Sequence, residues 1–213
     1  MIIAIDGPSA SGKGTLARRL AAALDLACLD TGLLYRAVGA KLLARGQKPE
    51  DPAAAEQAAA DLALEDLSRA DLRSEAVGEA ASEVAALPGV RAQLLAFQRR
   101  FAAQPPDDKA GAVLDGRDIA TVVCPEADVK VFLTANLETR AARRSKELQE
   151  RGEEAIYPRV LQEMQDRDAR DSGRAAAPLR PADDAIVIDT TEMDGDAVFE
   201  AVLAVAQSRL AGD

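Results

Sequence analysis

The sequence predicts an α/β fold with a five-stranded parallel sheet flanked by helices, and two observations lead to this prediction. Short apolar runs, rich in β-branched residues, alternate with longer segments in which apolar residues recur at helical spacing. Strands that alternate with helices favour a parallel sheet with right-handed crossover connections. We find neither an internal repeat nor a linker, so we predict a single domain over residues 1–213 that carries insertions.

The expected strands are the apolar runs at residues 1–5, 27–29, 112–114, 129–133 and 186–188. A helix is expected from Lys13 to Leu24, and further helices at 31–45, 136–151, 158–173 and 194–210. Thr31 and Asn136 are the expected N-caps of two of them, Pro158 begins a third, and Gly173 ends it. Residues 47–106 are rich in Ala, Glu and Asp, which predicts a mostly helical segment.

The composition excludes several classes of protein. The formal net charge of −10 disfavours binding of a nucleic-acid polymer, which requires a basic surface. The chain has no histidine, which excludes catalysis and metal binding through histidine. Cys28 and Cys124 lie among apolar residues and are expected to be buried rather than paired. The first apolar run is too short for a signal peptide, and no run approaches the ~18 residues of a membrane span. We expect a cytoplasmic monomer without a membrane partner.

The strongest motif follows the first expected strand. It reads Gly7-Pro8-Ser9-Ala10-Ser11-Gly12-Lys13-Gly14-Thr15 and matches the phosphate-loop pattern, with the threonine one place later than usual. The glycines let backbone N–H groups point at a phosphate, and the following helix adds its positive N-terminus. Lys13 can reach the β- and γ-phosphates, and the Thr15 hydroxyl can bind Mg²⁺. The motif therefore predicts a bound nucleoside triphosphate with Mg²⁺.

The phosphate loop alone does not distinguish a kinase from a GTPase or a mechanical ATPase. A GTPase is disfavoured because the sequence lacks an N/T-K-x-D motif for guanine. Another small-molecule kinase, such as an adenylate or shikimate kinase, remains an alternative. So does a nucleotide-binding regulator without turnover.

Five further motifs narrow the choice when they are taken in order. They are Leu29-Asp30-Thr31-Gly32-Leu33-Leu34-Tyr35-Arg36, Ala81-Ser82-Glu83-Val84-Ala85, Pro88-Gly89-Val90-Arg91, Asp115-Gly116-Arg117-Asp118 and Arg167-Asp168-Ala169-Arg170-Asp171-Ser172-Gly173-Arg174. Together with the Gly-Lys-Gly-Thr form of the loop, this set resembles bacterial cytidylate kinases along essentially the whole chain. The resemblance implies a P-loop kinase fold, with a monophosphate-binding insert at 37–108 and a lid at 151–174. It also implies phosphorylation of CMP and dCMP by ATP.

The resemblance also implies roles for particular residues. Arg36 and Arg117 would bind the acceptor phosphate, and Arg174 would approach the reacting groups as the lid closes. The residues implied in contact with the acceptor nucleoside are Asp30, Thr31, Ser82, Arg91 and Asp118 around the base, and Arg167 and Asp171 at the ribose. Arg140 and Arg144 resemble arginines that flank ATP in related nucleotide kinases.

The chemistry of several of these residues supports the same roles. Asp115 and Arg117 follow a strand's carboxyl end, where open α/β sheets bind ligands, and Asp115 can hold a Mg²⁺-bound water. A carboxylate such as Asp118 with an arginine such as Arg91 complements the donor and acceptors of cytosine. Arg167, Asp171 and Arg174 are spaced to share one helix face. Lys13, Asp115, Arg117 and Arg174 are thus the predicted catalytic residues, and Thr15 and Asp115 the predicted metal ligands.

Simpler interpretations of two of these groups are disfavoured, because all the motifs recur together in family order. Arg167 and Asp171 could form an ordinary surface ion pair, and Arg140 and Arg144 could lie on a solvated helix face.

The insert departs from the family pattern, because residues 62–77 lack the strand-like alternation that family members show there. We expect this part of the insert to be shortened or mostly helical.

Overall fold

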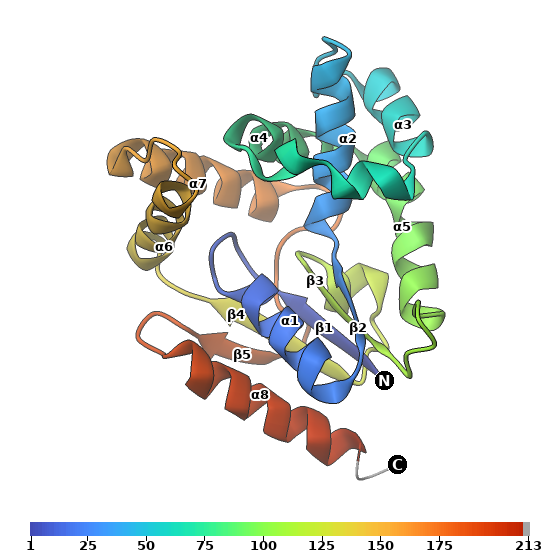
Figure 1. Cartoon of the computed structure of the whole chain (residues 1–213), viewed down its shortest axis with the longest axis vertical. Helices are drawn as coiled ribbons and strands as arrows, with labels where there is room; N and C mark the ends of the chain where they lie inside the picture. Colours follow the sequence, from blue (N-terminus) through green and yellow to red (C-terminus); the bar gives the residue numbers. More distant parts are fainter. Residues whose placement is uncertain (211–213) are drawn as a thin grey trace. The chain divides into compact units, whose positions relative to one another are not determined.

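The computed structural model describes residues 1–210 and confirms the predicted α/β fold (Figure 1). Five parallel strands form one sheet in the order β2-β3-β1-β4-β5. The strands are β1 (Ile2–Asp6), β2 (Ala27–Asp30), β3 (Ala112–Gly116), β4 (Val129–Thr134) and β5 (Ile186–Asp189). Each expected strand is present, and its observed ends lie within two residues of the expected ones.

Eight α-helices are described. They are α1 (Lys13–Leu24), α2 (Gly32–Ala44), α3 (Pro52–Ala60), α4 (Glu75–Val84), α5 (Pro88–Ala103), α6 (Leu137–Glu150), α7 (Tyr157–Gly173) and α8 (Gly195–Leu210). Asn136 caps α6 as predicted, because its side-chain oxygen accepts a hydrogen bond from the Thr139 N–H at 2.7 Å. Thr31 stands at the N-cap of α2 but does not make the predicted side-chain capping bond. None of the helices in this part of the chain has the length and apolarity needed to span a membrane.

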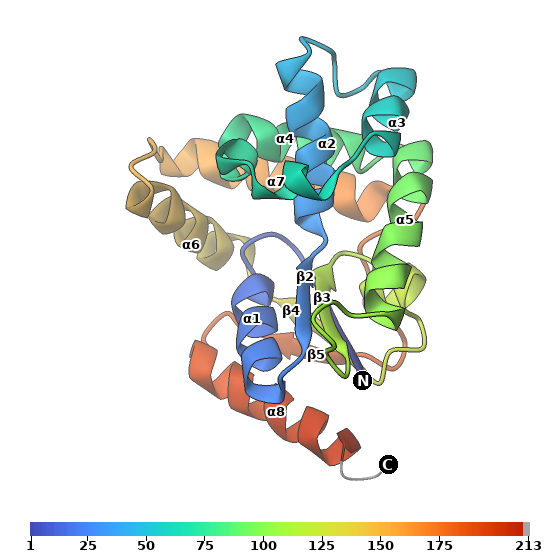
Figure 2. The same cartoon turned by 45° about the vertical axis from the view of Figure 1, so that its right-hand side comes forward.

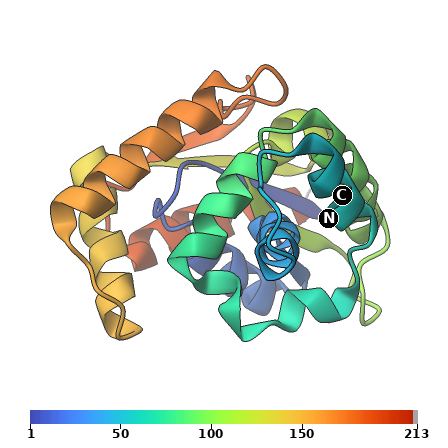
Figure 3. The same ribbon diagram turned by 90° about the horizontal axis from the view of Figure 1, so that it is seen from above.

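The chain forms two compact units. The first comprises residues 1–29 and the chain from Pro105 onward, and the second comprises Asp30–Gln104. In the first unit, one face of the sheet packs on α1 and α8, which lie side by side in Figures 1 and 2. Ile3, Ile5, Leu20, Val131 and Val202 are among the fully or almost fully buried side chains of this core. Helices α6 and α7 of this unit pack against each other (Figure 3).

The register of the strands brings their carboxyl ends to one edge of the sheet. Ile5 of β1 pairs with Asp115 of β3, and Asp6 pairs with both Gly116 of β3 and Phe132 of β4. The connection from β1 leads to β2 on one side, whereas the connection from β3 leads to β4 on the other. Such a reversal at the carboxyl ends of parallel strands is where open α/β sheets bind ligands.

The second unit is helical, as expected for residues 47–106. Helix α2 packs on α3 and α4, and α3 packs on α5. Between α3 and α4 the chain forms two 3-10 turns, Leu64–Ser68 and Ala70–Arg73, so this stretch contains no strand. Gly39 allows α2 and α4 to approach closely, because a Cβ there would lie 3.0 Å from the Ala80 Cβ.

One expectation about the cysteines is wrong. Cys124 is buried, but Cys28 is exposed although its neighbours in the sequence are apolar. Side chains alternate between the two faces of a strand, so Cys28 of β2 points away from the side on which Ala27 and Leu29 are buried.

Candidate nucleotide-binding site

The loop between β1 and α1 has the curled backbone that a phosphate cradle requires. Gly7, Ala10 and Gly12 have φ of 146°, 57° and 97°. Gly7 must also be small, because a Cβ there would lie 2.0 Å from the Leu133 carbonyl oxygen on β4. Steric exclusion at Gly7 and left-handed backbone at Gly12 together explain why glycine occupies these positions.

Lys13 and the start of α1 complete this loop. The Lys13 ammonium donates a hydrogen bond to the Pro8 carbonyl at 2.6 Å, so the buried side chain folds over its own loop. Gly12 is the N-cap of α1 and supplies no capping side chain. The first N–H groups of a helix lack intrahelical partners, and a bound phosphate can accept from them. The loop residues therefore fit an anionic phosphate chain.

Asp115 lies beside the first turn of α1. Its carboxylate oxygen Oδ2 is 3.6 Å from the position that a Cβ on Gly14 would take, and the next residue, Thr15, is exposed. Among residues 1–210 there is no cluster of three acidic, histidine or cysteine side chains that could hold a metal alone. Mg²⁺ in phosphate-transfer sites commonly uses one or two protein oxygens and the phosphates. Thr15 and Asp115 fit that mode of binding.

Asp6 anchors the segment that follows β3, a role that the sequence analysis did not identify. Its buried carboxylate accepts hydrogen bonds from the Ile119 and Ala120 N–H groups, both at 2.8 Å. Burial raises the pKa of Asp6 to about 6, although the two hydrogen bonds act in the opposite direction. The signal in the sequence was an acidic residue that ends a buried strand. Asp118, which directly precedes Ile119, is also buried.

A buried ionic cluster joins this segment to α7. The Asp171 carboxylate accepts from Arg117 Nε at 2.9 Å and from Arg174 Nη2 at 2.8 Å. Burial alone would raise the pKa of Asp171, but the positive charges of Arg117, Arg167 and Arg174 outweigh burial and lower it. Burial alone would likewise lower the pKa of Arg117, but the negative charges around it, Asp171 foremost, raise it.

One alternative and one expectation for this cluster are wrong. Asp171 is not part of an exposed surface pair, because only 4% of the residue is accessible to solvent. Arg174 does not share a helix face with Arg167 and Asp171. Helix α7 ends at Gly173, and Arg174 follows in an extended conformation (φ −60°, ψ 134°). From this position, Arg174 Nη2 donates to Asp171 Oδ1 at 2.8 Å.

Helix α6 holds the phosphate loop through Arg140. This side chain donates to the Ser9 carbonyl at 3.4 Å, to the Ala135 carbonyl at 2.9 Å and to the Asp168 carboxylate at 2.6 Å. Arg140 is buried, so the alternative of a solvated helix face is wrong for it. Arg144 instead pairs with Glu147 of its own helix at 2.9 Å.

In the second unit, Arg36 and Ser82 lie along the packed faces of α2 and α4. The Arg36 guanidinium donates to the Leu72 carbonyl at 2.7 Å. It lies over Gly78, where a Cβ would be 3.1 Å from Arg36 Nη2. Ser82 is one helical turn beyond Gly78 on α4, and its buried hydroxyl has no hydrogen-bond partner in the structure. A buried hydroxyl of this kind is suited to a ligand.

The other predicted residues of this unit are placed as follows. Arg91 on α5 donates to the Ala85 carbonyl at 3.2 Å, and its guanidinium lies 5.6 Å from the centre of the Tyr35 ring. Thr31 is buried, and the Asp30 carboxylate lies close to Gly32. Tyr35 was not predicted as a site residue. Its proximity to Arg91 is decided by the packing of α2 on the rest of the unit.

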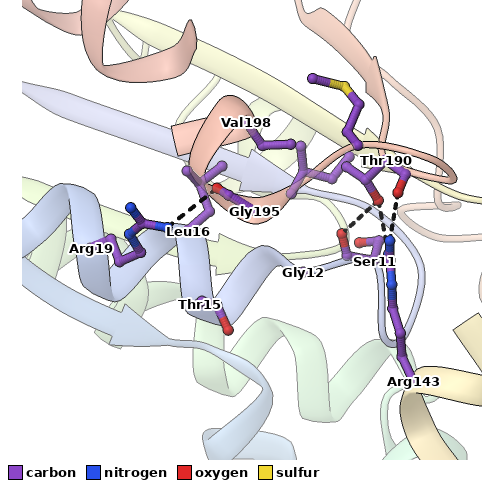
Figure 4. A pocket seen from close by; sticks show the side chains of 11 residues that line it. Ser11, Gly12, Thr15, Leu16, Arg19, Arg143, Thr190, Gly195 and Val198 are labelled. Atoms are coloured by element: carbon purple, nitrogen blue, oxygen red, sulfur yellow. Dashed lines mark hydrogen bonds between the residues drawn. The ribbon is translucent and has the colours of Figure 1, made fainter. Parts of the chain in front are cut away.

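A pocket of about 310 Å³ opens beside the phosphate loop in the first unit (Figure 4). Ser11, Gly12, Thr15 and Leu16 contribute from the loop and α1, and the turn between β5 and α8 contributes from the other side. The pocket also includes Arg19, Leu133, Arg143, Thr190, Met193, Gly195 and Val198. Arg140 and Arg144 were predicted from the sequence, whereas Arg143, Thr190 and the β5–α8 turn were not. Nothing local distinguishes these residues, because the fold alone brings them to the loop.

The fold and this loop define a P-loop protein of the α/β class. Residues 3–208 match the family model described as cytidylate kinase. The cytidylate kinase of Paramagnetospirillum magneticum (strain ATCC 700264 / AMB-1) is 62% identical over 98% of this chain and 98% of its own. That of Xanthobacter autotrophicus (strain ATCC BAA-1158 / Py2) is 58% identical over the whole of both chains. The chain belongs to the cytidylate kinase family.

A solved structure is similar in fold. The crystal structure of an uncharacterized protein from Eubacterium ventriosum ATCC 27560 has a TM-score of 0.57, covers 98% of this chain and 99% of that chain, and is 15% identical. At that identity the likeness concerns the fold alone.

Proposed function

We propose that this protein transfers the γ-phosphoryl group of ATP to CMP or dCMP, giving ADP and CDP or dCDP. The observation that carries the proposal is the buried ionic cluster of Arg117, Asp171 and Arg174, in a chain of the cytidylate kinase family. Arg117 directly follows β3, which pairs with β1, and β1 leads directly into the phosphate loop.

The phosphate loop would hold the triphosphate of the donor. Backbone N–H groups of residues 7–15 and the Lys13 ammonium supply hydrogen bonds and positive charge. On binding, the Lys13 ammonium would exchange the Pro8 carbonyl, 2.6 Å away, for phosphate oxygens. The pocket of about 310 Å³ beside the loop has the size and mixed lining for the donor's base.

Mg²⁺ would be held by the Thr15 hydroxyl and, directly or through water, by Asp115. When bound, it would neutralise charge on the β- and γ-phosphates.

The transfer itself requires positioned cations rather than a general base. An oxygen of the acceptor's phosphate forms the new bond to the γ-phosphorus, while the bond to the β–γ bridging oxygen breaks and leaves ADP. The attacking oxygen already carries negative charge, which agrees with a chain that contains no histidine. Lys13, Arg117 and Arg174 would stabilise the charge that spreads over the transferred group.

The residues proposed to bind the acceptor follow from the family resemblance. Arg36 and Arg117 would bind its phosphate. Thr31, Ser82, Arg91 and Asp118 would read the cytosine, with Asp30 beside them, and Arg167 and Asp171 would hold the ribose. The unpartnered hydroxyl of Ser82 supports this assignment, since a ligand would satisfy it. Arg140, buried between the Ser9 carbonyl and Asp168, would support the phosphate loop, with Arg144 nearby on α6.

Several features of this proposal remain predictions. They are the organisation of residues 1–213 as one domain, the insert at 37–108, the lid at 151–174, the monomeric state, the cytoplasmic location and the lack of nucleic-acid partners.

A coupled assay of ADP release tests the proposal. Purified protein with ATP and Mg²⁺ is given CMP, dCMP, UMP, AMP or GMP in turn, and EDTA is added in a parallel series. Turnover with CMP and dCMP, little with UMP, and loss of turnover in EDTA are expected. The Arg117→Ala variant should lose two to three orders of magnitude in kcat, because a cation next to the transferred group is removed. Release of no ADP with any monophosphate would refute the assignment and favour a regulator without turnover.

A further inference from the structure

Three carbonyl groups of the phosphate loop are held by three different donors. The Pro8 carbonyl accepts from Lys13, and the Ser9 carbonyl accepts from Arg140. The Ser11 carbonyl accepts from the hydroxyl of Thr190 at 3.2 Å. Thr190 follows β5, far from the loop in the sequence, and was not among the residues predicted to be functional.

Thr190 is buried, and Arg143 contacts both its hydroxyl and its carbonyl (Figure 4). Arg143 Nη1 donates to it at 3.0 Å, and Arg143 Nη2 donates to the Thr190 carbonyl at 2.5 Å. The guanidinium fork therefore binds both the hydroxyl and the carbonyl of this residue. A hydroxyl has one hydrogen, and a donation from Arg143 occupies one of its lone pairs. The hydrogen remains for the carbonyl oxygens of Ser11 and Thr134, which lie 3.2 and 3.0 Å away.

These two carbonyls do not depend equally on the hydroxyl. The Thr134 carbonyl also accepts from the Thr190 backbone N–H at 2.7 Å, as part of the pairing of the strand ends. The hydroxyl is thus the contact that Thr190 makes to the phosphate loop itself. Replacing the hydroxyl would leave the backbone bond to Thr134 and the bond from Arg143 to the Thr190 carbonyl in place.

Holding the Ser11 carbonyl also orients the next N–H group. The C=O and N–H of a trans peptide lie in one plane and point in opposite directions. The bond from Thr190 to the Ser11 carbonyl therefore sets the direction of the Gly12 N–H. Gly12 has a φ of 97° and lacks a Cβ, so no side chain of its own restricts the rotation of this peptide. The orientation has to be maintained from outside the loop.

We propose that Thr190 is a positioning residue for the donor phosphates: its hydroxyl, oriented by Arg143, fixes the Ser11–Gly12 peptide so that the Gly12 N–H faces the bound phosphate. The proposal rests on the proposed binding of ATP at this loop. Arg143 and Thr190 also line the pocket beside the loop, so they connect the proposed base site to the phosphate site.

The test compares Thr190→Val with Thr190→Ser and with a matched control, Thr191→Val. Valine keeps the branched shape but removes the hydroxyl, whereas serine keeps the hydroxyl. Thr191 is the adjacent residue, and its hydroxyl contacts Asp189 and the Asn136 N–H but not the phosphate loop. The dissociation constant for a non-hydrolysable ATP analogue is measured with Mg²⁺ and without acceptor, well below the unfolding temperature. Kinetic constants for ATP and CMP are then measured separately.

Loss of one hydrogen bond that orients the ligand should weaken ATP binding about two- to tenfold in Thr190→Val. The KM for CMP should stay within about twofold, and Thr190→Ser and Thr191→Val should bind the analogue like the wild-type protein. If the role of Thr190 were purely structural, the substitution would weaken the binding of ATP and of CMP alike. Equal ATP affinity in Thr190→Val and the wild type, or a serine variant as weak as the valine variant, overturns the proposal. If the valine variant does not fold, Thr190→Ala makes the same comparison without the added methyl group.

A double-mutant cycle tests the part played by Arg143. If Arg143 acts through the Thr190 hydroxyl, Arg143→Ala combined with Thr190→Val should weaken ATP binding by less than the product of the two single effects. Full additivity overturns the role assigned to Arg143. A wild-type protein that binds the analogue but forms no ADP with CMP would refute the proposed function. The comparison of dissociation constants for the analogue would still test the role of Thr190, because it requires no turnover.

Discussion

Replacement of Asp171 by asparagine should destabilise the protein far more than a similar change on the surface of the same helix. The Asp171 carboxylate is bonded to Arg117 and Arg174, whose side chains are only 18% and 5% exposed. An asparagine has no negative charge, and its NH₂ group would face a guanidinium. Both arginines would then lack their nearest counter-charge in a largely desolvated position.

The size of the effect follows from this burial. Removing one partner of a buried ion pair destabilises proteins by about 3–5 kcal/mol. Asp115 and Asp168 also act on Arg117, and Arg117 retains some contact with solvent. We therefore expect a loss at the lower end, about 3 kcal/mol, in the free energy of unfolding of Asp171→Asn.

The assay is urea denaturation at pH 7, with Glu163→Gln as the matched control. Glu163 pairs with Arg159 on α7 at 2.7 Å, but the two side chains are 43% and 64% exposed. Solvent screens such a pair, so the control should lose only a few tenths of a kcal/mol. The two ion pairs have similar lengths and differ in burial, so the comparison isolates the effect of burial.

The pH dependence gives a second measurement of the same cluster. The pKa of Asp171 is lowered in the folded protein, so the folded state binds this proton less readily than the unfolded chain. The stabilisation is present above the ordinary carboxyl pKa of 3.8 and is lost as the pH falls through the lower, folded value. The difference in the free energy of unfolding between the wild type and Asp171→Asn should therefore become smaller below about pH 4. A gap no larger than that of the control, or one unchanged at low pH, would refute this reasoning.

Two further predictions concern the start of the phosphate loop. Gly7→Ala should lower the unfolding temperature and weaken ATP binding, because its Cβ would lie 2.0 Å from the Leu133 carbonyl oxygen; a calorimetric transition at the wild-type temperature would contradict this. For Asp6, the folded pKa of about 6 lies above the ordinary 3.8, so its stabilising contribution is present below about pH 4 and is lost as the pH rises to about 6. Across that range, the free energy of unfolding of the wild type, measured by chemical denaturation, should fall by roughly 3 kcal/mol relative to that of Asp6→Asn. If the two proteins showed parallel dependence of this free energy on pH, the raised pKa would be excluded.

Local patterns were sufficient for most of the fold. The bounds of α1 agree with the prediction because leucines at helical spacing and the glycine-rich loop mark them independently. The strands were predictable because buried parallel strands are short apolar runs that end at turn residues. The 3-10 turns at 64–73 and the π-helical turn Ile119–Val123 were not predicted. The π-helical turn is held in part by the Asp6 carboxylate, which lies far away in the sequence.

The candidate site divides in the same way. The phosphate-loop residues could be predicted because one continuous segment contains all the chemistry of the cradle. Asp6, Arg143 and Thr190 could not be predicted, because each acts on a backbone group from a distant part of the chain. A lone aspartate, arginine or threonine is common, and its partners are not written near it in the sequence.

The sequence by itself determined the class of fold, the phosphate loop and the resemblance to cytidylate kinases, since these depend on local spacing and on motifs in order. The tertiary structure decided which charges are buried and which backbone groups are held. It ended α7 before Arg174, buried Asp171 between two arginines and brought Thr190 to the Ser11 carbonyl. Burial and hydrogen-bond partners depend on contacts between residues remote in the sequence, and such contacts exist only once the chain has folded.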